Sequence, residues 1–231
     1  TISRANSCWL SARSPLPIQL DSAAELQMDW RHISLRTPEN RLIFQVQTLM
    51  EHAMREFWAE RCFMEIHSPK LMATASESGA ELFELPYFGG KASLAQSPQF
   101  YKQMAMAAGF ERIFEIGPVF RANPSFTSRH DTEFTSVDME ISWIDSHEDV
   151  MKMEEEWLRY VLGRVAFVHG ERIRELFGVE VVVPTTPFPR MTLEEGRAIL
   201  AAGGHEIPHK ADLDPEGERR LAAHILEKFG H

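Results

Sequence analysis

The chain has 231 residues, of which 44% are hydrophobic, so it holds enough apolar material for the core of one large domain. Its two cysteines, Cys8 and Cys62, exclude a disulfide framework and show no CxxC metal spacing, and no apolar run reaches the roughly 20 residues of a membrane span. A formal net charge of −10 without a basic stripe indicates that the chain does not by itself hold a nucleic-acid backbone. We therefore expect a cytoplasmic protein with no membrane partner.

The first predicted helix of the chain follows a linker. We interpret residues 1–20 as the remnant of that linker and expect the domain to begin at residue 21. Thr37 and Pro38 predict a helix start, with Thr as N-cap and Pro at the first helical position. Apolar residues then recur at helical spacing to about Glu60. They are Leu42, Ile43, Val46, Leu49, Met50, Ala53 and Phe57.

Short strands and a second helix are expected next. The strands are residues 63–66, 82–85 and 92–95. The first stops near Pro69, residues 72–81 are small and polar like a loop, and residues 87–90 join the last two strands as a hairpin. Ser97-Pro98 repeats the Thr-Pro signal and opens a helix that Gly109 ends.

Two strands, residues 112–121 and 134–144, flank a polar loop. Because side chains alternate between the faces of a strand, each of these strands has an apolar face and a polar face. In the second strand Val137, Met139, Ile141 and Trp143 fall on the apolar face, whereas Phe134, Ser136, Asp138 and Glu140 lie opposite. In the first strand Phe114, Ile116 and Phe120 oppose Glu115, Gly117 and Arg121. Trp143 and, further along the chain, Trp157 are expected in the core. A sheet face that gathers such charges lines either solvent or a site.

The remainder of the chain, residues 146–231, is expected to be a helical continuation of this domain. Ser146 with Asp149 predicts the capped start of a long helix to about His169, whose acidic run at 154–156 is solvated. A Val-rich strand with a Pro-rich turn is expected at 179–190. Two further helices begin at Thr192 (with Glu195) and at Asp214-Pro215.

One set of polar residues suits an amino acid that is activated on ATP. Gln99 and Lys102 share a helix face, Arg121 ends the first of the two long strands, Arg129-His130 lies in the loop, and Asp138 lies on the second strand. Cations hold phosphates and carboxylates, an aromatic ring stacks on a base, and anions hold an ammonium group.

The order and spacing of three segments resemble the class II aminoacyl-tRNA synthetases that activate Asp, Asn and Lys, above all the archaeal and eukaryotic-type aspartyl enzymes. The segments are LAQSPQFYKQ (94–103), FERIFEIGPVFR (110–121) and RHDTEFTSVDME (129–140). The likeness runs from about Leu16 to Arg190. The resemblance implies an α+β fold, an antiparallel β-sheet flanked by helices, with the first two family motifs within residues 21–145. Pro69 would be the motif-one proline at a dimer interface.

The resemblance also implies an aspartate site. Glu77 would close over the α-ammonium group, and Gln99 would contact the same end of the substrate, with Ser97 close by. Lys102 would pair with the aspartate side-chain carboxylate. Asp138 would hold Lys102 in place. These roles rest on matched positions in the family pattern.

The ATP site implied by the resemblance centres on Arg121, the catalytic residue, which would bridge the substrate carboxylate and the α-phosphate. Arg129 would reach the γ-phosphate, supported by His130, and Phe134 would stack under adenine. Mg²⁺ would bridge the phosphates, with no metal ligand within this chain. The ATP-binding set is Arg121, Asn123, Arg129, His130, Asp131 and Phe134.

Two departures from the family pattern shape the functional hypotheses. Asn123 stands where the family usually has Glu, and the Gly-rich third motif, GxGxGxxR, is not found before His231. We expect a truncated catalytic core without the anticodon-binding domain, from an aspartate–tRNA ligase that acts on L-aspartate and tRNA (mainly through domains absent here) as a homodimer. The alternatives are a non-catalytic synthetase-like remnant and a paralogue that forms asparagine from aspartate and ammonia.

Overall fold

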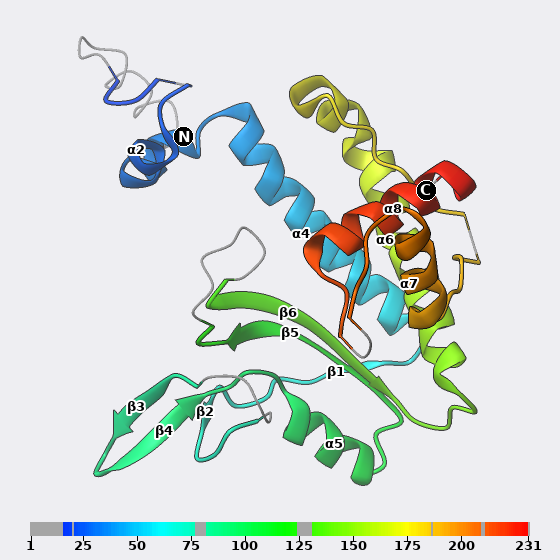
Figure 1. Ribbon diagram of the computed structural model, residues 1–231. Coiled ribbons are helices and arrows are strands. Elements are labelled where there is room, and N and C mark those ends of the chain that lie inside the picture. The colour runs from blue at the N-terminus through cyan, green and yellow to red at the C-terminus, as the bar shows by residue number, and fades with distance from the viewer. Residues whose placement is uncertain are drawn as a thin grey trace.

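The computed structural model describes residues 16–19, 21–76, 82–123, 131–185, 187–208 and 211–230 (Figure 1). Two short helices, α2 (Ala24–Asp29) and α3 (Arg31–Ser34), precede the long helix α4 (Pro38–Ala59). Thr37 caps α4 as expected, because its hydroxyl accepts a hydrogen bond from the backbone N–H of Asn40 at 3.2 Å. Within the described ranges, no helix combines the length and the apolar character needed to cross a membrane.

The first of two small sheets carries the two long strands, which were predicted to within three residues at each end. Strand β5 (Arg112–Phe120) pairs antiparallel with β6 (Glu133–Ile141), and β1 (Met64–Glu65) pairs parallel with β5. The register places Glu115 opposite Asp138. This register decides which polar side chains of the two strands become neighbours.

The second sheet has the order β2-β4-β3 and is antiparallel. Strands β3 (Glu84–Tyr87) and β4 (Gly90–Leu94) form the expected hairpin. Strand β2 (Leu71–Met72) was not predicted and lies just before and within the segment expected to be a loop. Helix α5 (Gln99–Ala107) follows, and Gly109 ends it with φ of +90°, a conformation that favours glycine.

The core lies on one face of the first sheet, where α4 and α6 (His147–Phe177) pack side by side (Figure 1). Trp58 of α4 contacts Phe114 of β5, with ring centroids 4.6 Å apart, and stacks on Trp157 of α6 at 5.5 Å. Trp157 therefore packs against the core, as expected. The buried hydrophobic core cluster comprises Ala53, Met54, Phe57, Trp58, Phe63, Phe114, Ile116 and Val161.

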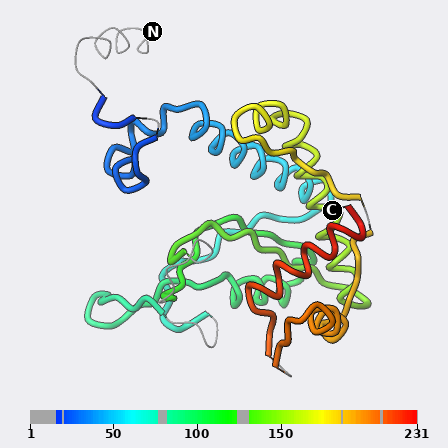
Figure 2. Tube along the Cα trace, turned by 45° about the horizontal axis from the view of Figure 1, so that its top comes forward, coloured from blue at the N-terminus to red at the C-terminus, as the bar shows by residue number. Residues whose placement is uncertain are grey.

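The C-terminal region is helical, as predicted. The capping box of Ser146 and Asp149 starts α6, which runs past the expected end to Gly178, whose φ is +67°. Thr192 caps α7 (Leu193–Ala202) and Asp214 caps α8 (Pro215–Phe229). Figure 2 follows the same chain path from another side.

Three expectations about the C-terminal region and the segment that follows β6 were wrong. Residues 179–185 and 187–190 form no strand, because the segment is held by side chains of α6 instead: Glu155 accepts a hydrogen bond from the backbone N–H of Phe188 at 3.1 Å and pairs with Arg190. Glu155 is therefore buried and not solvated. Trp143 lies outside the core and is exposed, with φ of +60°, because β6 ends at Ile141 and the strand alternation ends with it.

Candidate functional site

The opposite, polar face of the first sheet carries a compact ionic cluster. The Nζ atom of Lys102, from α5, lies 2.8 Å from Asp138 Oδ1 and 3.2 Å from Glu140 Oε2, both on β6. The Lys102 side chain is only 14% exposed. Because residues two apart on a strand share a face, both carboxylates reach one ammonium group. The predicted Lys102–Asp138 pair is thus present; Glu140 as a second partner was missed, although its place on the same face was predicted.

The charge of Lys102 is maintained by these two carboxylates. Burial alone would lower the pKa of Lys102, but the hydrogen bonds and charges of Asp138 and Glu140 outweigh it and raise that pKa above the ordinary value. The ammonium group is therefore protonated at neutral pH. It carries three N–H donors, so two carboxylates leave one donor for a further partner.

A second ion pair lies beside the first on the same face. Glu115 of β5, the register partner of Asp138, is buried and accepts from Lys70 Nζ at 2.8 Å. It also accepts from the backbone N–H of Ser68 at 3.0 Å and from its hydroxyl at 2.7 Å. A Cβ atom on Gly117 would lie 3.3 Å from Glu115 Oε1, so glycine leaves room for this carboxylate.

Glu115 thereby fixes the segment that contains Pro69. Sequence analysis had placed Glu115 on the polar face but gave it no role. The signal that could have found it is the Ser-Pro-Lys sequence at 68–70, which supplies two hydrogen-bond donors next to a strand end. Pro69 itself is exposed.

The segment that leads into α5 is held by a buried serine. Ser76 Oγ accepts from the backbone N–H groups of Gln96 at 3.0 Å and Ser97 at 3.3 Å. Ser97 Oγ in turn accepts from the backbone N–H of Gln99 at 3.3 Å. Ser97 is buried and Gln99 is half-buried, so the backbone of this segment is fixed beside Lys102 on the same helix.

The proposed ATP-binding side chains that the structure describes lie at the far end of β5 and β6. The guanidinium carbon of Arg121 is 5.7 Å from the centre of the Phe134 ring, within the range of a cation–π contact. The backbone N–H of Arg121 donates to Thr132 O at 2.9 Å. Asn123 is half-buried and Asp131 is exposed. Glu77, Arg129 and His130 lie outside the described residues.

The facing side chains of Arg121 and Phe134 have the chemistry that a nucleotide requires. A cation and an aromatic ring that face one another can hold a phosphate and a base, respectively. In the part of the chain that the structure describes, no group of three His, Cys, Asp or Glu residues could hold a metal ion.

Comparison with known proteins identifies the family. Residues 23–230 match the model of the class II tRNA synthetases (D, K and N). The chain is 42% identical over 223 residues to the aspartate–tRNA(Asp) ligase of Pyrococcus abyssi, covering 95% of this chain and 51% of that protein. It is 45% identical over 213 residues to the aspartate–tRNA(Asp/Asn) ligase of Methanopyrus kandleri, covering 91% and 49%. The chain thus spans about half the length of the curated relatives it matches.

Solved structures show the same architecture. The asparaginyl-tRNA synthetase of Pyrococcus horikoshii, complexed with asparaginyl-adenylate, superposes with a TM-score of 0.84 and 32% identity over 94% of this chain and 50% of that one. The aspartyl-tRNA synthetase of Entamoeba histolytica gives 0.78 and 28% over 99% and 44%. The fold is that of a class II synthetase catalytic core. The chain belongs to the class II tRNA synthetases of the D, K and N group.

The first prediction concerns the buried pair of Glu115 and Lys70. Glu115→Gln removes the charge but keeps the size, and we expect it to lower the free energy of unfolding by about 1–3 kcal/mol, since a buried hydrogen-bonded charge is lost. Urea denaturation followed by circular dichroism measures this change.

Glu84→Gln is the matched control, because Glu84 and Lys91 also meet at 2.8 Å but both side chains are exposed. Exposed ion pairs contribute little to stability. Equal effects of the two substitutions would show that burial of Glu115 has no energetic consequence.

Proposed function

We propose that this chain is the amino-acid- and ATP-binding part of an aspartate–tRNA ligase. The observation that carries the proposal is the charged, nearly buried Lys102 that Asp138 and Glu140 hold on the polar face of the sheet. An ammonium group in that position suits a substrate with a side-chain carboxylate. The relatives named above as aspartate ligases support the same assignment.

The proposed reaction begins with attack of the aspartate α-carboxylate on the α-phosphorus of ATP, which gives aspartyl-adenylate and releases pyrophosphate. Arg121 neutralises the charge that develops at the transferred phosphate, while Phe134 lies under the adenine ring. Lys102 holds the side-chain carboxylate and so orients the substrate. Mg²⁺, when bound to ATP, neutralises part of the phosphate charge. The aspartyl group is then transferred to tRNA.

Preference for aspartate over asparagine follows from charge. The two amino acids have nearly the same shape, so a pocket must distinguish a carboxylate from an amide. A protonated Lys102 pairs with a carboxylate through a charge-assisted hydrogen bond, roughly twice as strong as a neutral one. An amide would offer the remaining donor of Lys102 only a neutral oxygen, in addition to the carboxylates of Asp138 and Glu140. We also propose a cytoplasmic location, because the proposed reaction supplies protein synthesis.

The second prediction concerns substrate choice. In a polypeptide that joins this segment to the remaining half of an aspartate–tRNA ligase, Lys102→Met should lower aspartate-dependent pyrophosphate exchange by about 100-fold or more. ATP binding should be retained, because Lys102 lies on the amino-acid side. Lys91→Met, at an exposed ion pair, is the control. Near-normal exchange in Lys102→Met would contradict the assignment of Lys102.

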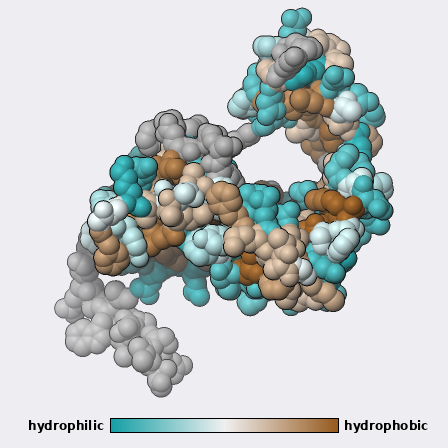
Figure 3. Space-filling model, turned by 90° about the horizontal axis from the view of Figure 1, so that it is seen from below, coloured by the Kyte–Doolittle hydropathy of each residue, from teal (hydrophilic) through white to brown (hydrophobic). Residues whose placement is uncertain are grey.

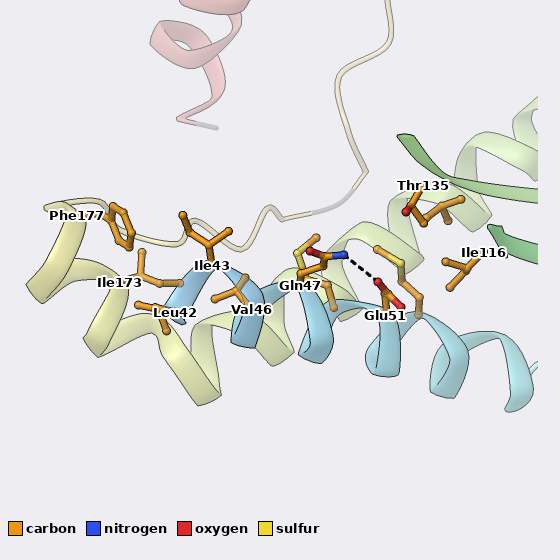
Figure 4. Close-up of a pocket in the computed structure, with 12 residues that line it drawn as sticks. Leu42, Ile43, Val46, Gln47, Glu51, Ile116, Thr135, Ile173 and Phe177 are labelled. Carbon is orange, nitrogen blue, oxygen red and sulfur yellow. Dashed lines mark hydrogen bonds between the residues drawn. The ribbon is translucent and has the colours of Figure 1, made fainter. Parts of the chain in front are cut away.

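We also propose a homodimer that forms through α4. A groove of about 520 Å³ is lined by this helix, by α6 and by residues of β5 and β6, and its lining is mostly apolar (Figure 4). Ile43 and Val46 of α4 face Ile173 and Phe177 of α6 across it. Ile43 is 52% exposed, so this half of α4 leaves uncovered the apolar face that sequence analysis predicted. On the face shown in Figure 3, by contrast, hydrophobic patches lie among hydrophilic residues.

The third prediction tests this dimer. Sedimentation should show the chain as a dimer at micromolar concentration, and Val46→Glu should convert it to a monomer, because an unpaired charge in an apolar interface is costly. Met104→Glu, at an exposed position on α5, should leave the dimer intact. A well-folded monomer of the unaltered chain would contradict the proposal.

The fourth prediction is that the 231-residue chain alone makes aspartyl-adenylate at close to the background rate. Among the described residues, Arg121 is the cation that we assign to the phosphates. The chain spans about half the length of the relatives it matches. Removing one preorganised electrostatic group typically costs about 10²–10³ in rate, and several missing groups cost more. Pyrophosphate exchange by the purified chain measures this rate. Clear turnover that Arg121→Ala abolishes would show that these residues suffice.

A further inference from the structure

The hairpin of β3 and β4 presents two aromatic rings at its tip. It projects away from the rest of the molecule in both views (Figures 1 and 2). Phe88, in the turn, is 91% exposed, and Tyr87 before it is half exposed. Their ring centroids are 4.7 Å apart at 81°, an edge-to-face contact. The two rings therefore support one another and leave their remaining surface open to solvent.

Neither the turn nor the core explains the aromatic ring of Phe88. Tyr87 pairs with Gly90, so Phe88 and Gly89 are the two turn residues, and both have positive φ, +47° and +125°. Such turns favour Asn-Gly, and a bulky residue at positive φ is strained. A sequence selected only to form this hairpin would place a small polar residue here. The exposed ring is therefore unfavourable both for the backbone conformation of the turn and for the hydration of its apolar surface. A role in binding would explain why an aromatic residue is present here.

The charge around the tip favours an uncharged contact. Lys91 and Glu84 form an ion pair at 2.8 Å just behind the turn, so they cancel, and the whole chain has a net charge of −10. A ligand that carries phosphates gains little from such a surface through its charge. It can gain from stacking, which every nucleobase offers through its flat face.

We propose that Tyr87 and Phe88 form a stacking platform for an unpaired base next to the acceptor end of tRNA. This inference rests on the proposed function, because it takes tRNA as the substrate. Strand β4 connects the platform directly to the segment of Ser97 and Gln99. At roughly 3.3 Å per residue, β4 extends roughly 13 Å from Gly90, next to the turn, to Leu94. A single-stranded RNA end, whose bases are free to stack on aromatic side chains, suits that separation.

The test uses the 231-residue chain and an RNA stem with an unpaired four-nucleotide 3′ tail, compared with the same stem without a tail. Binding is measured by fluorescence anisotropy of labelled RNA at low salt. Phe88→Asn removes the ring and places a residue that tolerates positive φ, so the hairpin is kept or stabilised. Phe167→Asn is the matched control, because its ring on α6 is 90% exposed but lies outside the hairpin.

We expect the chain to bind the tailed RNA more tightly than the blunt stem. Phe88→Asn should weaken that binding by roughly five- to a hundredfold, the range given by loss of one base–aromatic stack, whereas Phe167→Asn should not. Phe88→Trp should retain it. Equal affinity for both RNAs, equal effects of the two Asn variants, or absence of RNA binding would each overturn the proposal.

Two further measurements separate the possible failures. If Phe88→Asn instead abolishes self-association in sedimentation, the tip binds a second copy of the chain and the RNA proposal is wrong. Aspartate binding, followed by calorimetry in the same variants, reports on the proposed function alone, because Phe88 is not part of the amino-acid site. Loss of RNA binding with aspartate binding intact is the result that the proposal requires.

Discussion

The antiparallel register of β5 and β6 determines the position of the polar groups in the candidate site. Because Glu115 lies opposite Asp138, the two carboxylates share one face of the sheet, and each meets a lysine from a different segment. A shift of one residue in this register would turn every side chain of one strand to the other face. The Lys102 cluster and the Phe114–Ile116 core contacts would then be lost together, so folding and site formation depend on one constraint.

The parts of the fold that the sequence predicted are those with local causes. Thr37, Ser146, Thr192 and Asp214 cap helices through hydrogen bonds within a few residues, and strand alternation identified both faces of β6. What could not be predicted depends on distant partners. Glu155 is buried because Arg190 and the backbone of Phe188, more than 30 residues away, meet it. Strand β2 exists only because β4 pairs with it.

The candidate site shows the same division. The pair of Lys102 and Asp138 came from a helix face, a strand face and the family resemblance, and the structure brings the two together at 2.8 Å. The contact of Arg121 with Phe134 could not be foreseen from spacing, because Arg121 follows β5 and Phe134 lies on β6, across a loop. Glu115 was placed on the correct face, but its partners Ser68 and Lys70 are brought to it only by the parallel pairing of β1 with β5.

The charges on the polar face explain why an amino acid suits this site under the proposed function. Lys70 and Lys102 face three carboxylates, those of Glu115, Asp138 and Glu140, so the cluster has a net charge of −1. A free anion gains nothing from that net charge, whereas a ligand that also carries an ammonium group does. The one donor that remains on Lys102 still gives a local contact for a carboxylate, and Arg121 at the strand end gives another. A dicarboxylic amino acid can make all three contacts at once, because its ammonium group faces the excess carboxylate of the cluster while its two carboxylates reach Lys102 and Arg121.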